Sequence, residues 1–260
     1  MSKTSKGRKK RKGMKEETLF LFGIPYFYGG MTQALSLTQN ALEDGRAFSV
    51  FTPGATVAAR AVWDADLATL LSSADLLLPD GKGVSLAARL CGVGRLPAVA
   101  GIDFAERLLA FANEKGARVF FYGAAQGVAM RAAERMHRTY PSLCIKTADG
   151  YGDDPWQTVA DFMPNIVCVG LGAGRQEAWI AKNKARVGGV LIGVGGSFDV
   201  WAGEKRRAPR FFRRAGLEWA WRTLLEPRRL PRLFPLPRYY LKCVRFRQIA
   251  KKRERKQRRV

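Results

Sequence analysis

The sequence has few of the residues from which metal sites and histidine-based catalytic sites are built. Its 260 residues include one histidine, His137, and four cysteines that stand far apart without a C-x-x-C pair. A zinc site needs clustered ligands, and a Ser-His-Asp triad would depend entirely on His137. We therefore expect neither a metal site nor a bound cofactor. We place His137 on a helix surface and expect Cys91, Cys144, Cys168 and Cys243 to be buried structural thiols.

The chain also lacks long apolar runs and the common nucleotide fingerprints. No stretch of about 18 apolar residues is present, and the basic N-terminus has no apolar segment of the kind that directs secretion. These features predict a cytoplasmic protein. Neither G-x-G-x-x-G nor G-x-x-x-x-G-K-[ST] occurs, so the usual dinucleotide and P-loop motifs are absent.

The net charge of +23 is concentrated at the two ends of the chain. Residues 1–15 carry eight Lys/Arg and no acid, and residues 222–260 carry 15 Lys/Arg and two Glu. The middle is therefore close to neutral. A nucleic-acid-binding domain usually spreads its basic residues over a folded face. We accordingly predict a disordered basic arm over 1–15, a folded domain over 16–221 and a basic appendage over 222–260, with no nucleic acid as partner.

Short apolar runs alternate with helix-period stretches along the folded part. The strand-like runs are Leu19–Ile24, Phe48–Phe51, Leu76–Leu78, Val119–Tyr122, Ile166–Leu171 and Val190–Val194. The helical stretches are Met31–Leu42, Val57–Leu71, Val84–Leu90, Phe104–Asn113, Val128–Tyr140 and Glu177–Ala185. This alternation predicts an α/β fold with a Rossmann-like, doubly wound, mainly parallel sheet, followed by a helical and basic C-terminal appendage.

Glycines and acids follow several of the predicted strands. They occur at Asp80-Gly81, Tyr122-Gly123, Gly170-Leu171-Gly172 and Gly195-Gly196-Ser197-Phe198-Asp199. Ligands of such folds bind beyond the carboxyl ends of the strands, and glycine lets the backbone approach a phosphate or sugar closely. Each cluster alone fits an ordinary strand-to-helix turn equally well. Four of them at one edge of a sheet indicate a polar ligand.

The appendage contains four prolines between residues 227 and 237, which exclude one continuous helix. Residues 237–256 then read as an amphipathic helix with Tyr240, Leu241, Val244 and Ile249 on one side and basic residues around the rest. This pattern predicts contact with an anionic membrane surface. A solvated basic tail is the alternative.

Asp80 is the candidate catalytic base, because it follows an apolar strand and should lie at the rim of the crevice. An Asp that caps the helix after Gly83 is the alternative. Asp64-Ala65-Asp66 forms a D-x-D, but it lies in a helical stretch where residues i and i+2 face different directions. We therefore interpret it as a solvated helix face. Arginines of the appendage, Arg222, Arg229 and Arg232, suit a diphosphate, and a solvated or lipid-facing position is the alternative for each of them.

Over about residues 19–235 the chain resembles the WecG/TagA/CpsF glycosyltransferases. The resemblance is carried by Ala74-Asp75, Leu78-Pro79-Asp80-Gly81, Gly101-Ile102-Asp103, Tyr122-Gly123, Val169-Gly170-Leu171-Gly172, Gln176-Glu177 and Trp179. It continues through Val194-Gly195-Gly196-Ser197-Phe198-Asp199, Ala202-Gly203, Arg207-Ala208-Pro209, Gly216-Leu217-Glu218-Trp219, Arg222, Glu226-Pro227, Arg229 and Arg232.

The resemblance implies an inverting, metal-independent transferase that works on the inner face of the cell membrane. Its donor would be a UDP-sugar carrying N-acetylmannosamine, its uronic acid, or glucose. Its acceptor would be a polyprenyl-diphosphate-linked sugar, and its product would feed teichoic acid, enterobacterial common antigen or exopolysaccharide. The family also switches between an inactive homo-oligomer and an active monomer, through an appendage that engages the membrane.

By the same resemblance, Asp80 is the base and Thr52 helps to form the catalytic site, while Gln176 lines the pocket. The arginines at 222, 229 and 232 close over the diphosphate. The remaining predicted donor-site residues are Gly81, Asp103, Tyr122, Gly123, Gly172, Gly195, Gly196 and Asp199.

Three positions depart from the family pattern: Gly54 replaces an Asn, Ala98 an Arg and Gly174 a Pro. The first two lie near the predicted pockets and leave the sugar open. Two other functions remain as alternatives, a basic nucleic-acid-binding protein and an inactive scaffold of a polysaccharide complex.

Overall fold

The computed structural model describes residues 17–257, except for the side chains of Arg222, Arg229 and residues 253–257. The predicted arm over 1–15 lies outside the described residues. The centre of the protein is a six-stranded sheet in the order β4-β3-β8-β7-β5-β6, in which every pair is parallel. Its strands are β3 (Phe48–Phe51), β4 (Leu76–Leu77), β5 (Arg118–Gly123), β6 (Cys144–Ala148), β7 (Ile166–Gly170) and β8 (Val190–Gly193).

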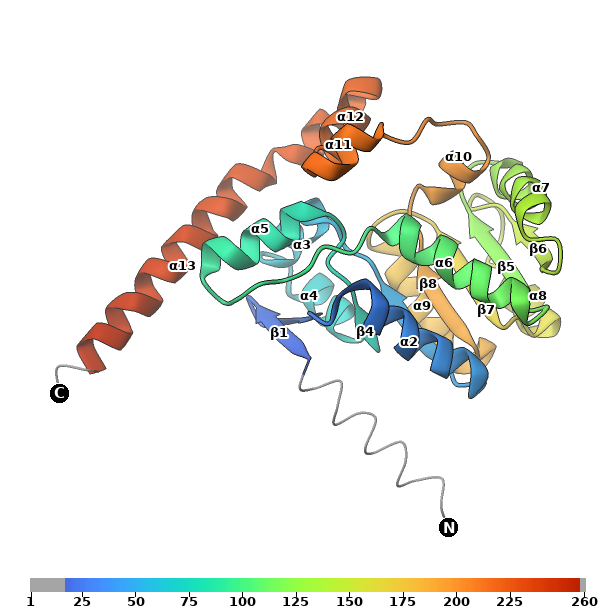
Figure 1. Ribbon diagram of the computed structural model, residues 1–260, viewed down its shortest axis with the longest axis horizontal. Helices are drawn as coiled ribbons and strands as arrows, with labels where there is room; N and C mark the ends of the chain where they lie inside the picture. The colour runs from blue at the N-terminus through green and yellow to red at the C-terminus, as the bar shows by residue number, and fades with distance from the viewer. Residues whose placement is uncertain (1–16, 258–260) are drawn as a thin grey trace, which may run out of the picture.

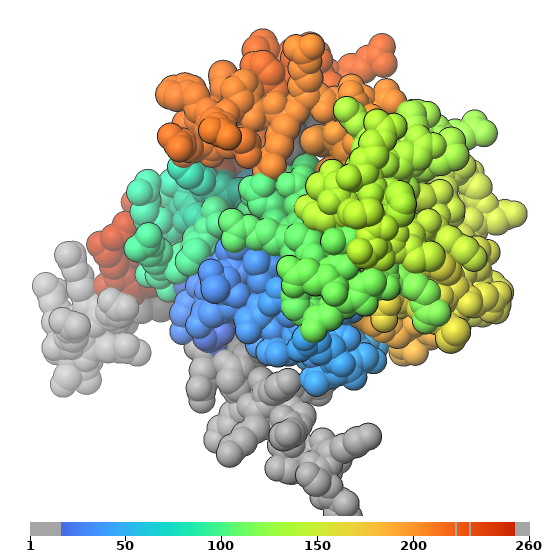
Figure 2. Space-filling view, turned by 45° about the vertical axis from the view of Figure 1, so that its right-hand side comes forward, coloured from blue at the N-terminus to red at the C-terminus, as the bar shows by residue number. Residues whose placement is uncertain are grey.

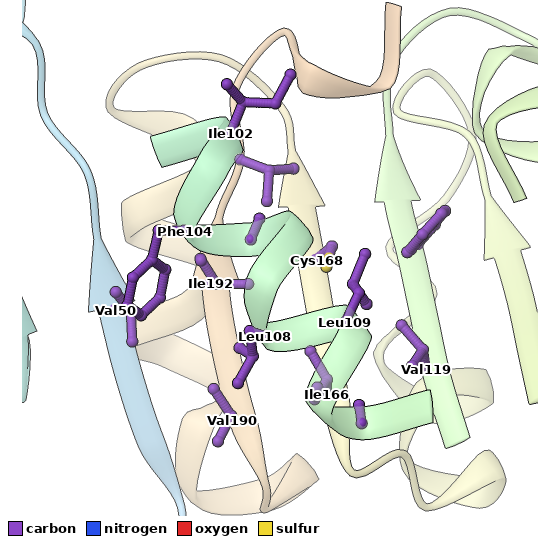
Figure 3. Packing of buried hydrophobic residues seen from close by; sticks show 14 of the residues in the cluster. Val50, Ile102, Phe104, Leu108, Leu109, Val119, Ile166, Cys168, Val190 and Ile192 are labelled. Atoms are coloured by element: carbon purple, nitrogen blue, oxygen red, sulfur yellow. The ribbon is translucent and has the colours of Figure 1, made fainter. Parts of the chain in front are cut away.

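The inner strands β3, β5, β7 and β8 are mostly apolar and are buried except at Arg118, because both faces of the sheet are covered. Successive side chains point to opposite faces, so that Val50 joins one core cluster and Phe51 the other. Figure 3 shows the first core, where Phe104, Leu108 and Leu109 of α6 (Gly101–Glu114) lie over the strands. The predicted doubly wound α/β fold is confirmed.

Helices cover both faces of this sheet, as Figure 1 shows with α2 and α6 in front and α9 behind. The first face carries α6 together with α2 (Gly30–Glu43), α7 (Val128–Thr139) and α10 (Ser197–Trp201). The second face carries α3 (Ala55–Ala61), α4 (Ala65–Ser72), α5 (Lys82–Cys91), α8 (Trp156–Phe162) and α9 (Arg175–Val187).

Two predicted elements are each divided in the structure. The run 19–24 is not one strand of the main sheet but a hairpin of β1 (Thr18–Leu21) and β2 (Ile24–Phe27). Its two turn residues, Phe22 and Gly23, both have positive φ, as a type I′ turn requires. The predicted helix over 57–71 is broken between α3 and α4.

The break between α3 and α4 is made by Asp64, whose side chain accepts a 2.9 Å hydrogen bond from the amide of Leu67. Asp64 is therefore the N-cap of α4 and not a residue on the face of a continuous helix. The expected mid-helix position of the D-x-D is wrong, and its first carboxylate has a capping role.

The prediction of buried thiols holds for three of the four cysteines. Cys91, Cys168 and Cys243 are buried, whereas Cys144 is exposed. Cys144 begins β6, which forms the edge of the sheet and has no fully buried residue. His137 is exposed on α7, as expected.

After α10 the chain forms a helical segment interrupted by prolines, which we call the appendage and which begins twelve residues before the predicted start at residue 222. It consists of α11 (Arg210–Ala215), α12 (Glu218–Leu225), the 3-10 helix η1 (Pro227–Leu233) and α13 (Pro235–Gln257). Figure 1 shows α13 as a long helix beside α5, the helix that it contacts together with α3. Among residues 17–257, no helix combines the length and the apolar character that crossing a bilayer requires.

The apolar face of α13 is not the one expected from the sequence. Tyr239 and Cys243 are completely buried against the body, and Leu236 and Tyr240 are partly buried beside them. Of the residues expected to share a membrane-facing side, Tyr240 and Val244 are partly buried, whereas Leu241 and Ile249 are exposed, so membrane contact through the latter two stays a prediction. The main apolar face of α13 is therefore used to dock the helix onto α5.

Candidate active site

The carboxyl ends of β3 and β8 lie side by side and are joined by Thr52. Thr52 follows β3 directly, and its hydroxyl donates a 2.9 Å hydrogen bond to the carbonyl of Gly193 at the end of β8. The chain winds from β3 outward to β4 on one side and then passes to β5 on the other side of β3. Crevices of this kind, where the strand order reverses, are the usual ligand sites of open α/β sheets.

Asp80 lies at the same edge of the sheet, just beyond β4. Its backbone amide donates to the carbonyl of Pro53, and it forms an isolated parallel bridge with Gly54. Its Oδ1 accepts a 2.9 Å hydrogen bond from the amide of Gly101, the first residue of α6. The N-terminus of a helix carries a partial positive charge, which attracts a carboxylate.

The alternative role of Asp80, capping the helix that follows it, is therefore wrong for that helix. The N-cap of α5 is Gly81, with φ of +73° and no side-chain hydrogen bond. Asp80 instead contacts the amide end of α6, which comes from a different part of the chain. Asp80 is only partly buried, and its carboxylate stands between Gly54, which follows β3, and the start of α6.

Gly101 lies against Thr52 and Gly54 lies beside Asp80, and neither glycine brings a side chain to the site. A Cβ on Gly101 would lie 2.9 Å from Oγ1 of Thr52, so any side chain there would force a shift. A Cβ on Gly54 would lie 3.8 Å from Oδ2 of Asp80, an ordinary contact distance. Position 54, where the chain departs from the family pattern, is thus directly beside the candidate base.

Gln176 and Glu177 form a chain of hydrogen bonds that leads to the glycine turn after β8. The buried Gln176 accepts a 3.0 Å hydrogen bond from the amide of Gly195 and donates a 2.8 Å bond to Glu177. Glu177 in turn accepts a 2.6 Å bond from the amide of Gly174. In this arrangement the side-chain amide of Gln176 holds the turn that was predicted to approach a phosphate.

Asp199 and Asp103 are both paired with basic residues of the connection between α10 and α11. Oδ2 of Asp199 lies 2.6 Å from Nζ of Lys205, and Oδ1 of Asp103 lies 2.5 Å from Nη2 of Arg207. Lys205 also contacts Glu226, at 3.3 Å. Lys205 was not among the predicted site residues. It stands in the run Glu204-Lys205-Arg206-Arg207, where nothing in the sequence distinguishes it from a solvated lysine.

The predicted residues at β5 and β7 are farther from Asp80 along the sheet. The ring of Tyr122 is buried against Trp179, with ring centroids 5.0 Å apart, and burial raises the pKa of its hydroxyl. Gly123 has φ of +129°, and a Cβ there would meet the backbone of Gly170 at 2.5 Å. Gly172, with φ of +84°, has open space around it, as have Gly81 and Gly195. Gly196 lies next to Gly195 in the same turn.

The structure describes the three predicted arginines of the appendage only in part. The backbones of Arg222 and Arg229 belong to α12 and η1, and their side chains lie outside the described residues. Arg232 is exposed on η1. Lys82, two residues after Asp80, donates a hydrogen bond to the carbonyl of Arg214, so α11 is seated over the start of α5. In Figure 2 the orange segment that contains α11 lies directly above the teal and green residues of this region.

The fold places Asp80, Thr52 and the glycine turn after β8 at the carboxyl edge of a parallel α/β sheet. The family model described as "Glycosyl transferase WecG/TagA/CpsF family" matches residues 19–255. The chain belongs to this family and is a glycosyltransferase.

Curated relatives carry one common name, N-acetylglucosaminyldiphosphoundecaprenol N-acetyl-beta-D-mannosaminyltransferase. The Bacillus spizizenii protein is 39% identical over 188 residues, which cover 70% of this chain and 73% of the relative. The Bacillus subtilis protein is 34% identical over 235 residues, covering 88% and 92%. A Staphylococcus aureus protein is 31% identical over 188 residues, covering 70% and 74%.

Proposed function

We propose that this enzyme transfers N-acetylmannosamine from a UDP donor to N-acetylglucosamine on undecaprenyl diphosphate. The names of the relatives support this sugar and this acceptor. The observation that carries the proposal is the position of Asp80, at the crevice between β4 and the start of α6, with Thr52 nearby. A carboxylate there can receive the proton of an acceptor hydroxyl.

In the proposed reaction, Asp80 takes the proton as the acceptor oxygen forms a bond to the anomeric carbon of the donor sugar. The bond from that carbon to the UDP oxygen breaks, and its electron pair leaves with UDP. The relatives are named for a β-linked product. Because nucleotide donors of this kind carry the sugar in α linkage, one displacement step inverts the anomeric centre.

The departing diphosphate needs positive charge or N–H donors around it. We assign this role to the glycine turn at residues 195 and 196 and to the arginines at 222, 229 and 232, so that the reaction proceeds without a metal ion. Guanidinium groups bind phosphate oxygens in pairs and suit this task. Full transfer in the presence of a strong chelator is the expected result, and a loss that added divalent metal restores would contradict it.

Association with an anionic membrane surface is the second part of the proposal. Phe211, Leu224 and Phe234 expose 73%, 71% and 77% of their surface on α11, α12 and the end of η1. Arg210, Arg214 and Arg232 are exposed on the same segment. Exposed apolar side chains next to arginines suit the boundary between lipid headgroups and acyl chains. The lipid-linked acceptor would reach the crevice from this side.

Replacing Asp80 with Asn tests the catalytic assignment. With UDP-N-acetylmannosamine and a short-chain lipid-diphosphate-N-acetylglucosamine, we expect Asp80→Asn to lower turnover about 100-fold or more while UDP binding is retained. Unchanged turnover would remove Asp80 from the mechanism.

The same assay with a panel of UDP-sugars tests the donor, because another sugar that reacts faster would overturn the assignment of N-acetylmannosamine. Sedimentation of the protein with and without vesicles would show whether a homo-oligomer gives way to a monomer.

A further inference from the structure

Lys205 links two acidic residues that belong to different parts of the molecule. Its Nζ lies 2.6 Å from Oδ2 of Asp199 on α10 and 3.3 Å from Oε1 of Glu226, which follows α12. Its backbone amide also donates a 3.0 Å hydrogen bond to the carbonyl of Asp199. Lys205 is therefore fixed to α10 at two points, and its ammonium group reaches the appendage.

On one side, this link leads to the glycine turn of the candidate donor site. A Cβ on Gly196 would lie 3.8 Å from Oδ2 of Asp199, so the carboxylate is beside the turn. Gly195 is held by Gln176, and Gly193 accepts the hydroxyl hydrogen bond of Thr52. A continuous set of contacts thus connects the crevice with Lys205.

On the other side, the link leads to the start of η1. Glu226 is the N-cap residue of η1 and directly precedes Pro227, whose ring restricts the backbone there. The position of Glu226 therefore governs where η1 begins, and η1 carries Arg229 and Arg232 in its 7 residues. A contact that holds Glu226 also places the backbone of these arginines relative to the sheet.

The cation of this link is the Lys205 ammonium group, and it is the part that an anion would contact. One ammonium group lies between two carboxylates, and its side chain is 39% exposed. An ammonium group has three N–H donors. One donates to Asp199 at 2.6 Å and Glu226 lies 3.3 Å away, so in the proposed complex the same ammonium group could also donate to a phosphate oxygen at the neighbouring glycine turn.

We propose that Lys205 is a positioning residue that couples occupation of the donor site to the seating of the C-terminal appendage. This inference depends on the proposed function, because it takes the glycine turn as the diphosphate site. Donor diphosphate and the Lys205–Glu226 pair stabilise the same arrangement of η1, so each strengthens the other. Loss of the pair uncouples the appendage without removing the donor site.

Hydrogen exchange of residues 218–233, measured with and without UDP, tests the coupling. In the unmodified enzyme, UDP should slow exchange in this segment. In Lys205→Met and in Glu226→Gln, UDP should still bind, about tenfold more weakly at most, while its effect on exchange falls several-fold. Lys205→Arg keeps a cation at the position and should retain most of the effect. Turnover should fall about tenfold in Lys205→Met and stay close to normal in Lys205→Arg.

Lys115→Met is the matched control, because it removes an exposed ion pair with Glu43 far from the crevice. It should change neither exchange nor turnover. If UDP binds to Lys205→Met and slows exchange of 218–233 as strongly as in the unmodified enzyme, the coupling is wrong. If UDP fails to bind even to the unmodified enzyme, the donor assignment is wrong instead. The two failures are therefore distinct.

Discussion

Asp80 and Gly101 are joined by a 2.9 Å hydrogen bond from a helix amide to a carboxylate, across 21 residues of sequence. The bond holds the candidate base at the amide end of α6, and Gly101 leaves room for Thr52 because it has no side chain. The positions of the base, the threonine and the helix start thus depend on one another. This relationship leads to the first of five predictions.

Gly101→Ala should lower both stability and activity. Its Cβ would lie 2.9 Å from Oγ1 and 3.1 Å from Cβ of Thr52, so α6 or β3 has to shift. We expect a loss of roughly 1–3 kcal/mol in the free energy of unfolding, typical of overpacking, and a clear fall in turnover. Gly54→Ala is the matched control for stability, because its nearest contact would be at 3.8 Å. Urea unfolding of both variants measures the difference, and equal stability would show that the crevice can relax.

Gly54→Asn should change substrate selectivity more than stability. Gly54 is the N-cap of α3 with extended backbone angles, so Asn fits there and stability should change by only a few tenths of a kcal/mol. The new side chain would stand beside Asp80. We expect the ratio of kcat/KM between two UDP-sugars to shift about fivefold or more. A panel of donors measures this ratio, and an unchanged ranking would separate position 54 from specificity.

The Asp75–Lys184 pair should make stability depend on pH. Burial raises the pKa of Asp75, but hydrogen bonds from Lys184 and Ser49 and the charge of Lys184 outweigh it, so the pKa lies below its usual value. A depressed folded-state pKa contributes stability above the unfolded pKa of about 3.9, which is lost as pH falls through the lower folded value.

Asp75→Asn should therefore cost roughly 1–3 kcal/mol at neutral pH, with a difference that shrinks in acid. Urea unfolding of the unmodified protein and the variant, from neutral pH to about pH 3, checks this. The exposed Asp161→Asn is the control and should show neither effect. A difference that stays constant with pH would mean that the ion pair does not contribute through its charge.

Cys144 should be the one thiol that reacts quickly in the native protein. It is exposed on the edge strand, whereas the other three are buried, and burial raises the pKa of Cys168. Reaction requires the thiolate and access to it. A chromogenic disulfide reagent should titrate about one thiol before unfolding and all four cysteines afterwards. Cys144→Ser should remove the fast phase, and a fast phase that persists would reveal opening of α13 at Cys243.

Phe234→Ser combined with Phe211→Ser should weaken binding to vesicles that contain anionic lipid. Both side chains are highly exposed on the appendage, and each apolar side chain that inserts into lipid adds to affinity. We expect at least a fivefold loss in vesicle flotation at low salt. Leu241→Ser on the solvent side of α13 is the control. A stronger effect of Leu241→Ser than of the phenylalanine pair would restore the original assignment of the membrane face to α13.

Much of the fold and half of the site follow from local sequence patterns. Apolar strands such as Ile166–Gly170 must be buried on both faces, which predicts a covered parallel sheet. Thr52 follows β3 directly and Asp80 comes three residues after β4, so their place at one edge of the sheet is also predictable. The sequence does not predict the hairpin at residues 22 and 23, because Phe-Gly is not a common turn pair. It does not predict the break between α3 and α4 either, because an Asp such as Asp64 can cap a helix or lie on its surface.

The sequence by itself determined the alternation of most strands and helices, the parallel sheet, the edge of the sheet that carries the candidate site, and the family, but not β6, α8 or α10. Tertiary structure alone decided which polar and charged groups meet. Asp80 with Gly101, and Lys205 with Asp199 and Glu226, are pairs whose partners lie far apart in the chain or look like solvated residues. The face that α13 buries was decided in the same way. A helix with apolar residues on several sides has no single face in its sequence, and the body of the protein selected Tyr239 and Cys243 because they fill the space beside α5.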